Sequence, residues 1–344
     1  MKKTSVIAIN LKPARFFLLS GIFFSVLYIS IFLSSALPPI VAEKDFIRLV
    51  LSCNASYTNV PLSSVGVFSL VKKDITNPEN TILSSDETDV SAVKVSVPQK
   101  SEENPLIKLS NATDLKINPE DYLASPLSFL KEDISVLIVH THTTESYTPS
   151  EKYNFTPTDT DRTTDKNYNM VVVGNEIEKI LASSGVKVYH DTSINDYPSY
   201  SGSYNKTATV IESYLKKDPS IKIVLDVHRD AIVGKSGEKI KYTTTINGET
   251  AAKIMFVTGS NLSGLQHDNW KENFSFAVQL QKHTLSLYPD LCRPINFRSQ
   301  RFNQQLAPGG IIVEVGTNGN TLDEALLGAR CFAVSLADFL NSQK

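Results

Sequence analysis

Two histidines and a glutamate lie close together in the sequence, directly behind a short apolar run. In IVHTHTTESY, residues 138–147, they are His140, His142 and Glu145, and the run that leads into them is SVLIV. A continuous apolar run of this length is typical of a strand that is buried on both faces. Imidazole and carboxylate groups are the ligands that zinc commonly takes from proteins. This stretch therefore predicts a metal site at a strand end.

Two later apolar runs also carry such side chains. In VLDVHRDA, His228 follows an apolar run, and in IIVEVGTNGN, Glu314 lies inside one. A catalytic zinc site needs three protein ligands, an open position for water, and a nearby carboxylate that takes a proton from that water. We predict His142, Glu145 and His228 as the ligands. Glu314 is then the predicted base.

Each of these residues also has a purely structural interpretation. His140 and His142 would point to one face of the sheet if the strand continued, so either could simply bond to its neighbours. Glu145 could instead stabilise the start of a helix. Asp165 competes with Glu145 as the carboxylate ligand, and its alternative role is a helix cap. An unpaired Glu314 would be costly to bury in an apolar strand, which favours a functional role.

Strands and helices alternate from about residue 135 to the end of the chain. This alternation predicts an α/β fold: a single domain with a central, largely parallel (mixed) sheet flanked by helices. Sites in such sheets lie beyond the carboxyl ends of the strands. The predicted strands are 136–139, 186–189, 221–227 and 310–315, with a hairpin over 240–258 that turns at Asn247-Gly248. The predicted helices are 167–184, 207–217, 270–287 and one that starts at Thr321.

Local signals set two helix ends. Thr321 and Glu324 have the spacing of a capping box. Asp165 is a candidate cap for the helix over 167–184, and Gly185 is suited to its end.

The segment 16–37 contains no charged residue. As a helix, at about 1.5 Å per residue, it is long enough to cross a hydrocarbon core of about 30 Å. Basic residues precede it, so we expect residues 1–15 in the cytoplasm and the rest of the chain outside. A cleaved signal peptide, cut near Ser34-Ser35-Ala36, is the alternative, but the apolar region is long for one. We therefore expect a retained transmembrane helix.

The rest of the chain, its net charge and its cysteines limit the possible classes of protein. Residues 38–130 are predicted as an extracytoplasmic tether and juxtamembrane region, because 72–108 is polar with little periodicity. The folded domain is predicted over 131–344. A net charge of −2 gives no reason to expect nucleic-acid binding. Three widely spaced cysteines without a CxxC pair predict neither a disulfide framework nor a thiolate zinc site.

Five blocks of the sequence resemble the stage II sporulation protein P family, a branch of the zinc-dependent N-acetylmuramoyl-L-alanine amidases. The resemblance covers about 131–344, and a membrane segment followed by a spacer also fits. The blocks, in order, are VLIVHTHTTESY, RTTDKNYNMVVVGNEI, VYHDTSINDYPSYSGSY, VLDVHRDA and RFNQQLAPGGIIVEVGTNGNT.

The resemblance implies a Zn²⁺ enzyme that acts on peptidoglycan. It implies cleavage of the amide bond between N-acetylmuramic acid and L-alanine, and a second, endopeptidase activity on peptide cross-links. It also implies a role in forespore engulfment, with stage II sporulation proteins D and M as partners. The chain would then be a single-pass protein of the mother-cell membrane, with its catalytic domain facing the septal or engulfment space.

The resemblance also implies roles for individual residues. The two amidase histidines fall on His142 and His228, and the catalytic glutamate falls on Glu314. In many amidases the carboxylate ligand opens the helix after the first histidine, where this chain has Asp165-Lys166-Asn167; Glu145 is the better candidate in this branch. Four further residues are expected to bind substrate: Arg229, Arg301, Asn303 and Gln304.

Two other functions compete with this interpretation. A His-x-His motif after a first strand also marks (β/α)₈ amidohydrolases, but the folded part is short for such a barrel and the hairpin interrupts its alternation. A non-catalytic extracytoplasmic scaffold that binds the cell wall is the alternative from a different class. Such a scaffold would tolerate loss of the metal-binding residues.

Overall fold

The computed structural model describes residues 97–100, 106–131, 133–158 and 160–343. All of them belong to one compact unit, Glu87–Lys344. The predicted transmembrane helix over 16–37 and most of the predicted tether lie outside the described residues. Among the helices that are described, none combines the length and the apolar character needed to span a bilayer.

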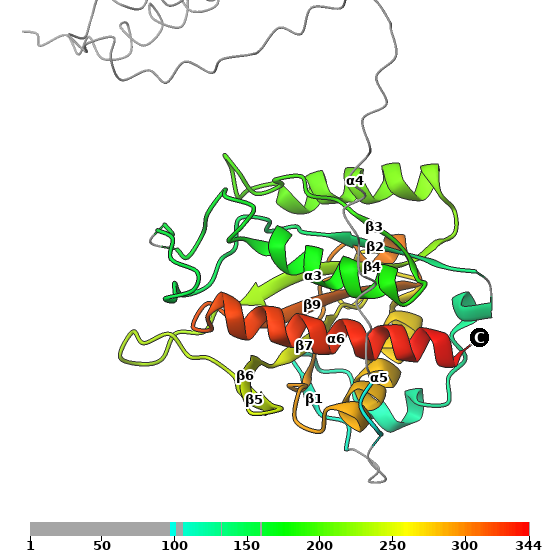
Figure 1. The fold of residues 1–344 in the computed structure, drawn as a ribbon. Helices are drawn as coiled ribbons and strands as arrows, with labels where there is room; N and C mark the ends of the chain where they lie inside the picture. Colours follow the sequence, from blue (N-terminus) through cyan, green and yellow to red (C-terminus); the bar gives the residue numbers. More distant parts are fainter. Residues whose placement is uncertain (1–96, 101–105, 132, 159, 344) are drawn as a thin grey trace, which may run out of the picture. The chain divides into compact units, whose positions relative to one another are not determined.

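A seven-stranded sheet forms the centre of the fold (Figure 1), in the order β1-β8-β7-β9-β4-β2-β3. Neighbouring strands are parallel except for β7 and β9, so the predicted mixed, largely parallel sheet is confirmed. The order runs between two different edge strands, which rules out a closed (β/α)₈ barrel. The strands are β1 (Leu109–Asn111), β2 (Ser135–Val139), β3 (Lys187–His190), β4 (Ile221–Asp230), β7 (Ile254–Thr258), β8 (Ile295–Phe297) and β9 (Gly309–Thr317).

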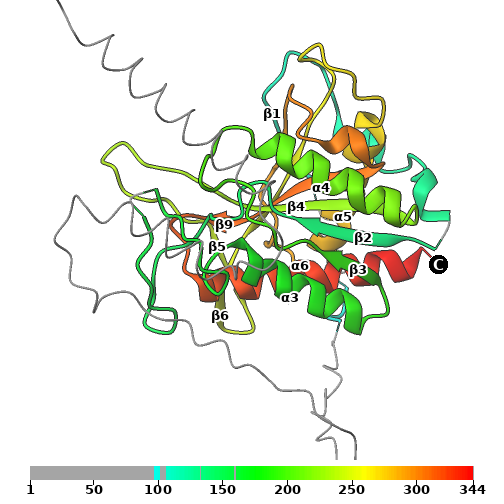
Figure 2. The same ribbon diagram turned by 90° about the horizontal axis from the view of Figure 1, so that it is seen from above.

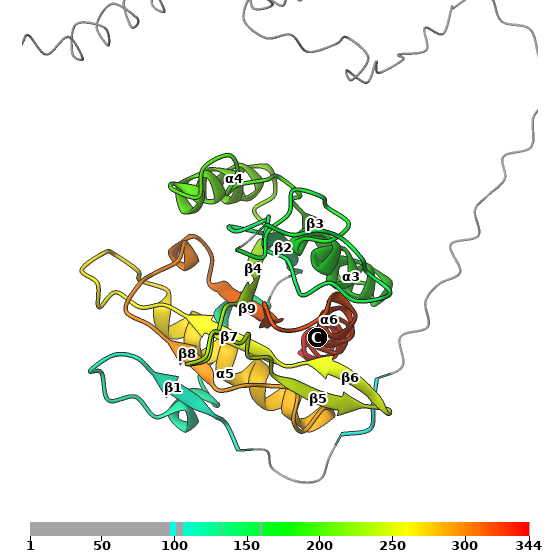
Figure 3. The same ribbon diagram turned by 90° about the vertical axis from the view of Figure 1, so that its left-hand side faces the viewer.

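Helices cover the two faces of the sheet unequally. Helices α3, α5 and α6 pack on one face around the large hydrophobic core, and α4 packs on the other face, over β2 and β4 (Figures 2 and 3). The longer helices are α3 (Met170–Ser183), α4 (Ser203–Lys217), α5 (Trp270–Leu287) and α6 (Leu322–Ser342). The short 3₁₀ helices are η2 (Pro119–Tyr122), η3 (Ser128–Lys131) and η4 (Gln304–Leu306).

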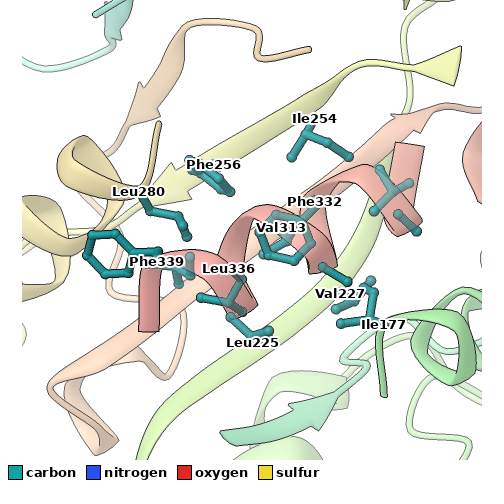
Figure 4. Packing of buried hydrophobic residues seen from close by; sticks show 14 of the residues in the cluster. Ile177, Leu225, Val227, Ile254, Phe256, Leu280, Val313, Phe332, Leu336 and Phe339 are labelled. Carbon is teal, nitrogen blue, oxygen red and sulfur yellow. The ribbon is translucent and has the colours of Figure 1, made fainter. Parts of the chain in front are cut away.

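The core fixes which face each strand residue takes. Leu225 and Val227 of β4 and Val313 of β9 pack beneath Phe332 and Leu336 of α6 (Figure 4). Successive side chains of a strand point to opposite faces of the sheet. The residues between these apolar ones, on β4 and β9, therefore point to the face that α6 does not cover.

The hairpin differs in part from its prediction. Asn247 and Gly248 do form the tight turn, both with positive φ, of 51° and 87°. However, the turn joins β5 (Thr243–Ile246) to β6 (Glu249–Ala252) in a separate two-stranded sheet. The predicted second strand of the hairpin was wrong, because Ile254–Thr258 instead enters the main sheet as β7 beside β9.

The capping predictions had mixed outcomes. Thr321 and Glu324 form the complete capping box at the start of α6. Asp165 does not cap α3; Asn169 does so, and its side chain accepts the backbone N–H of Val171. Asp165 lies upstream in an exposed turn, where its carboxylate accepts the N–H of Asn167 at 2.9 Å.

The folded body begins earlier than the sequence indicates. Residues 109–111 form β1 against β8, and the rings of Tyr122 and Phe129 pack against Phe274 and Phe276 of α5. A boundary between tether and domain after residue 130 is therefore too late. Three-residue strands and 3₁₀ turns are too short to leave a periodic pattern in a sequence.

The cysteines that the structure describes are structural. Cys292 and Cys331 are both buried and free, in line with a chain that has no predicted disulfide framework. Both side chains pack in the large hydrophobic core.

Candidate active site

Strands β4 and β9 place His228 beside Glu314. The two residues are Cα partners in the parallel ladder, so their side chains project from the same face of the sheet. Because Val227 and Val313 point into the core, His228 and Glu314 point to the opposite face. Residues 86 positions apart in the sequence (314 − 228) are thus neighbours at this site.

The turn after β2 brings two more of the predicted residues to the same place. The imidazole rings of His142 and His228 lie edge to face, with 5.3 Å between their centroids. Oε2 of Glu145 is 3.5 Å from Nδ1 of His228. The structure therefore brings together His142, Glu145, His228 and Glu314, which come from three separate segments of the chain.

Two arginines hold the carboxylate of Glu145. The backbone N–H of Arg229 donates to Oε2 at 3.3 Å, and the Arg162 guanidinium lies 3.4 Å from Oε1. Burial alone would raise the pKa of Glu145, but the hydrogen bond from His228 and the charge of Arg229 outweigh it and hold the pKa at about 2. Glu145 is therefore an ionised carboxylate that its neighbours fix in position.

Glu314 has the opposite electrostatic character. Burial raises the pKa of its carboxyl to about 8, against the charge of His228 and with the help of Glu145. Its Oε2 is enclosed and has no hydrogen-bond partner among the described residues. A carboxyl group with a free oxygen can exchange a proton with a bound molecule.

Asp226 is a member of the site that the sequence analysis did not assign. Its Oδ1 lies 2.8 Å from Nε2 of His228, and its carboxylate accepts the N–H and the hydroxyl of Thr141 at 2.8 Å and 2.6 Å. Although burial opposes the charged imidazole, Asp226 raises the pKa of His228 well above its ordinary value. The i, i+2 spacing to His228 in a strand was the signal that could have found it.

Tyr200 covers His142 at the surface. Its ring stacks on the imidazole at 4.4 Å, its hydroxyl lies 2.9 Å from Nε2, and 58% of the residue is exposed. The Arg162 guanidinium lies 5.0 Å from the centre of the same ring. A hollow lined by His142 and by residues 200–205 opens here to solvent.

Two of the alternative ligands lie elsewhere. His140 is fully buried; its ring contacts the carbonyl of Val227 at 2.9 Å and Nε2 of His190 at 2.8 Å. The strand ends at Val139, so the two histidines do not share a face as they would on a continuing strand. Asp165 is exposed in its own turn and does not join the group.

The predicted substrate-binding residues are mostly engaged within the protein. Arg229 is buried and donates to the carbonyls of Ser146 and Asp161, so it braces the loop that carries Glu145. Arg301 donates from Nη1 to the carbonyl of Gln266, and Asn303 donates to the carbonyl of Tyr204. Gln304 accepts the N–H of Gly259 and donates to the carbonyl of Val257.

The donor types at the site fit zinc, although their present arrangement is not that of a formed metal centre. Within the described part of the chain, no cluster of three or more His, Cys, Asp or Glu residues is arranged to hold a metal ion. However, Oε2 of Glu314 is a buried polar atom without a hydrogen-bond partner in that same part, and the ring of His228 lies between the carboxylates of Asp226 and Glu145. The two imidazoles of His142 and His228 and the ionised carboxylate of Glu145, beside Glu314, match the ligand set that zinc prefers.

Comparison with known proteins places the chain in a family. The family model described as stage II sporulation protein P matches residues 51–337. The stage II sporulation protein P of Bacillus subtilis (strain 168) is 29% identical over 209 residues, which are 58% of this chain and 49% of that protein. The matching region thus spans about half the length of that relative.

Solved structures of amidases resemble the fold weakly. The catalytic domain of CwlV, an N-acetylmuramoyl-L-alanine amidase from Bacillus (Paenibacillus) polymyxa var. colistinus, is 13% identical, with a TM-score of 0.37 over 60% of this chain and 99% of that one. The CwlD amidase from Clostridioides difficile, solved in complex with the GerS lipoprotein, is 11% identical, with a TM-score of 0.37 over 61% of this chain and 100% of that one.

Proposed function

The chain belongs to the stage II sporulation protein P family, and from this premise we propose that it is a zinc-dependent peptidoglycan hydrolase. Its proposed reaction is hydrolysis of the amide between N-acetylmuramic acid and L-alanine. The observation that carries the proposal is the convergence of His142, Glu145 and His228 beside Glu314, on the open face of the sheet.

In the proposed site, His142, Glu145 and His228 would hold the metal. Zinc would supply polarisation of the amide carbonyl and a more acidic water. Asp226 and Arg229 would act as positioning residues, since they contact His228 and Glu145 from the protein side. Such supporting contacts orient metal-binding side chains.

Glu314 is the proposed acid and base. Its free Oε2 would accept a proton from the attacking water while the water oxygen bonds to the amide carbon. The same carboxyl would then give that proton to the nitrogen as the carbon–nitrogen bond breaks. The products are a carboxylic acid on the muramic acid and a free amino group on L-alanine.

The proposal extends to location and partners. The uncharged segment 16–37, with basic residues before it, supports a membrane anchor with the catalytic domain outside the cytoplasm. Family membership supports a role in forespore engulfment at the mother-cell membrane, with stage II sporulation proteins D and M as partners. An endopeptidase activity on cross-links is part of the same proposal.

Digestion of purified cell wall tests the proposal. The full-length chain, purified in mild detergent and supplied with zinc, should release peptides with a new L-alanine amino terminus. Glu314→Gln should lower this rate at least about 100-fold, because it removes the proton acceptor. Glu249→Gln, the same substitution on the exposed β5–β6 hairpin, should leave the rate unchanged.

The result also separates the enzyme from the scaffold. A chain that binds the cell wall yet holds no zinc and releases no peptide would be the non-catalytic scaffold. If Glu314→Gln digests the wall at the wild-type rate while it folds and binds zinc normally, the assigned role of Glu314 is wrong.

A further inference from the structure

The open face of the sheet continues beyond Glu314 toward β1. Met255 of β7 is the Cα partner of Glu314, and Val257, two residues on, partners Asn296 of β8. Asn296 in turn partners Ser110 of β1. Side chains of Cα partners project from the same face. One continuous surface therefore leads from the candidate active site across three neighbouring strands.

A pocket of about 470 Å³ lies on this surface. Met255, Ser110 and Asn296 line it, so it begins on the strand next to Glu314. Neighbouring strands are about 4.8 Å apart, so the near wall of the pocket lies one strand away from the candidate base. Its polar walls come from Lys108, Asp230, Tyr242, Lys253 and Arg293, among others.

Arg293 lines this pocket, and one of its hydrogen-bond donors has no partner among the described residues. Its Nη2 donates to Oδ2 of Asp230 at 2.9 Å, and its guanidinium lies 4.3 Å from the centre of the Tyr242 ring. Only 12% of the side chain is exposed. Its Nη1 is enclosed and has no hydrogen-bond partner among the residues that the structure describes. An unused donor on a buried guanidinium is costly, and a carboxylate satisfies it well.

The charges around the pocket also favour an anion. Three cationic side chains line it (Lys108, Lys253 and Arg293) against one carboxylate, that of Asp230. Lys253 is 18% exposed and pairs with Asp290, which is 59% exposed and outside the lining. With Asp290 counted against its partner Lys253, three cationic side chains face two carboxylates, so the net charge around the pocket is +1 and favours an anion.

We propose that this pocket binds a carboxylate of the substrate's peptide, close to the scissile amide, with Nη1 of Arg293 as the main donor. This inference rests on the proposed function, since it assigns the peptide side of the substrate to the β7–β8–β1 surface. An extended peptide advances about 3.3 Å per residue, so an acidic residue near the amide reaches the pocket.

Paired substrates test the proposal. Two synthetic muramoyl peptides that differ at one acidic residue, free in one and amidated in the other, are hydrolysed by the full-length chain. We expect kcat/KM to favour the free carboxylate at least about tenfold, as for a charge-assisted hydrogen bond. Arg293→Gln should make the kcat/KM values of the two substrates equal. Arg293→Lys should keep part of the preference for the free carboxylate. Arg330→Gln, which removes the ion pair between Arg330 of α6 and Glu176 of α3, is the matched control and should keep the whole preference.

A second variant tests the pocket even if Arg293→Gln does not fold. Lys253→Gln leaves the Arg293–Asp230 pair intact and should reduce the preference, though less than Arg293→Gln does. No preference in the wild type, or an equal loss on both substrates in Arg293→Gln, would contradict the proposal.

Equilibrium binding separates this inference from the proposed function. The corresponding free and amidated peptides, labelled and without the sugar, are titrated onto the same proteins. Arg293-dependent preference for the free carboxylate without any hydrolysis would sustain the pocket and refute the hydrolase. Hydrolysis of the muramoyl peptides, together with equal binding of the free and amidated peptides, would support the hydrolase and refute the pocket. Inorganic phosphate is the third probe; if it binds through Arg293 and the peptides do not, the pocket serves a phosphate.

Discussion

Replacing Asp226 with Asn tests whether a buried carboxylate positions the candidate metal ligand His228. The substitution keeps the shape of the side chain and an oxygen that can accept the Thr141 N–H, which now lies 2.8 Å from Oδ1. It removes the negative charge 2.8 Å from Nε2 of His228. The fold should therefore survive while the support of His228 is lost.

The expected loss follows from the role of such supporting groups. Removal of a partner that orients a metal-binding histidine typically lowers metal affinity or activity about 10- to 100-fold. That range corresponds to about 1.4–2.7 kcal/mol. Zinc affinity, measured by competition with a chelator, and the rate of cell-wall digestion should fall together.

Asp218→Asn is the matched control. Asp218 accepts hydrogen bonds from Lys187, Tyr189 and Ser220 beside the amino end of β4, and the substitution removes the same charge. We expect no change in zinc affinity or rate for it. Wild-type zinc affinity and rate in Asp226→Asn, or equal losses in both variants, would refute the positioning role.

Three further predictions concern the ligand, the core and pH. Glu145→Gln should abolish stoichiometric zinc binding by the purified chain, as measured by metal analysis, while Asp165→Asn should retain it. The opposite result would make Asp165, and not Glu145, the carboxylate ligand. Phe332→Ala should lower the free energy of unfolding by about 3–5 kcal/mol in a denaturant titration, because it opens a cavity under α6, and a loss below about 1 kcal/mol would contradict that packing. Burial and the charge of Arg301 lower the pKa of His267 to about 4 in the folded chain. As the pH falls, the His267 imidazole is therefore protonated in the unfolded chain before it is protonated in the folded chain. Stability should therefore drop by up to about 3 kcal/mol between about pH 6.5 and about pH 4, and parallel stability curves for the wild type and His267→Gln would contradict this.

Long periodic elements were predictable from the sequence because their signal is repeated many times. The helix predicted over 270–287 is α5 with the same bounds, and the capping box at Thr321 starts α6 as predicted. The alternation of strands and helices was enough to predict the mixed, mostly parallel sheet. By contrast, β1 has three residues and pairs with a strand almost 190 positions away, so only the tertiary fold reveals it.

The candidate site was predictable in its residue types and less so in its geometry. Residues at strand ends converge because parallel strands share one edge, which is why His142, His228 and Glu314 lie together. The separation of His140 from His142 depends on a turn directly after Val139, and no periodic signal announces such a turn. Asp226 was overlooked because it lies inside an apolar strand, although its i, i+2 spacing places it on the same face as His228.

X-ray absorption at the zinc edge, on the full-length chain loaded with zinc, determines whether His142 and His228 bind the metal. We expect a first coordination shell of two imidazole nitrogens and carboxylate oxygen, with the imidazole signal reduced in both His142→Ala and His228→Ala and unchanged in His140→Ala. A zinc spectrum without imidazole, or one that neither of the first two substitutions alters, would contradict metal binding by these two histidines.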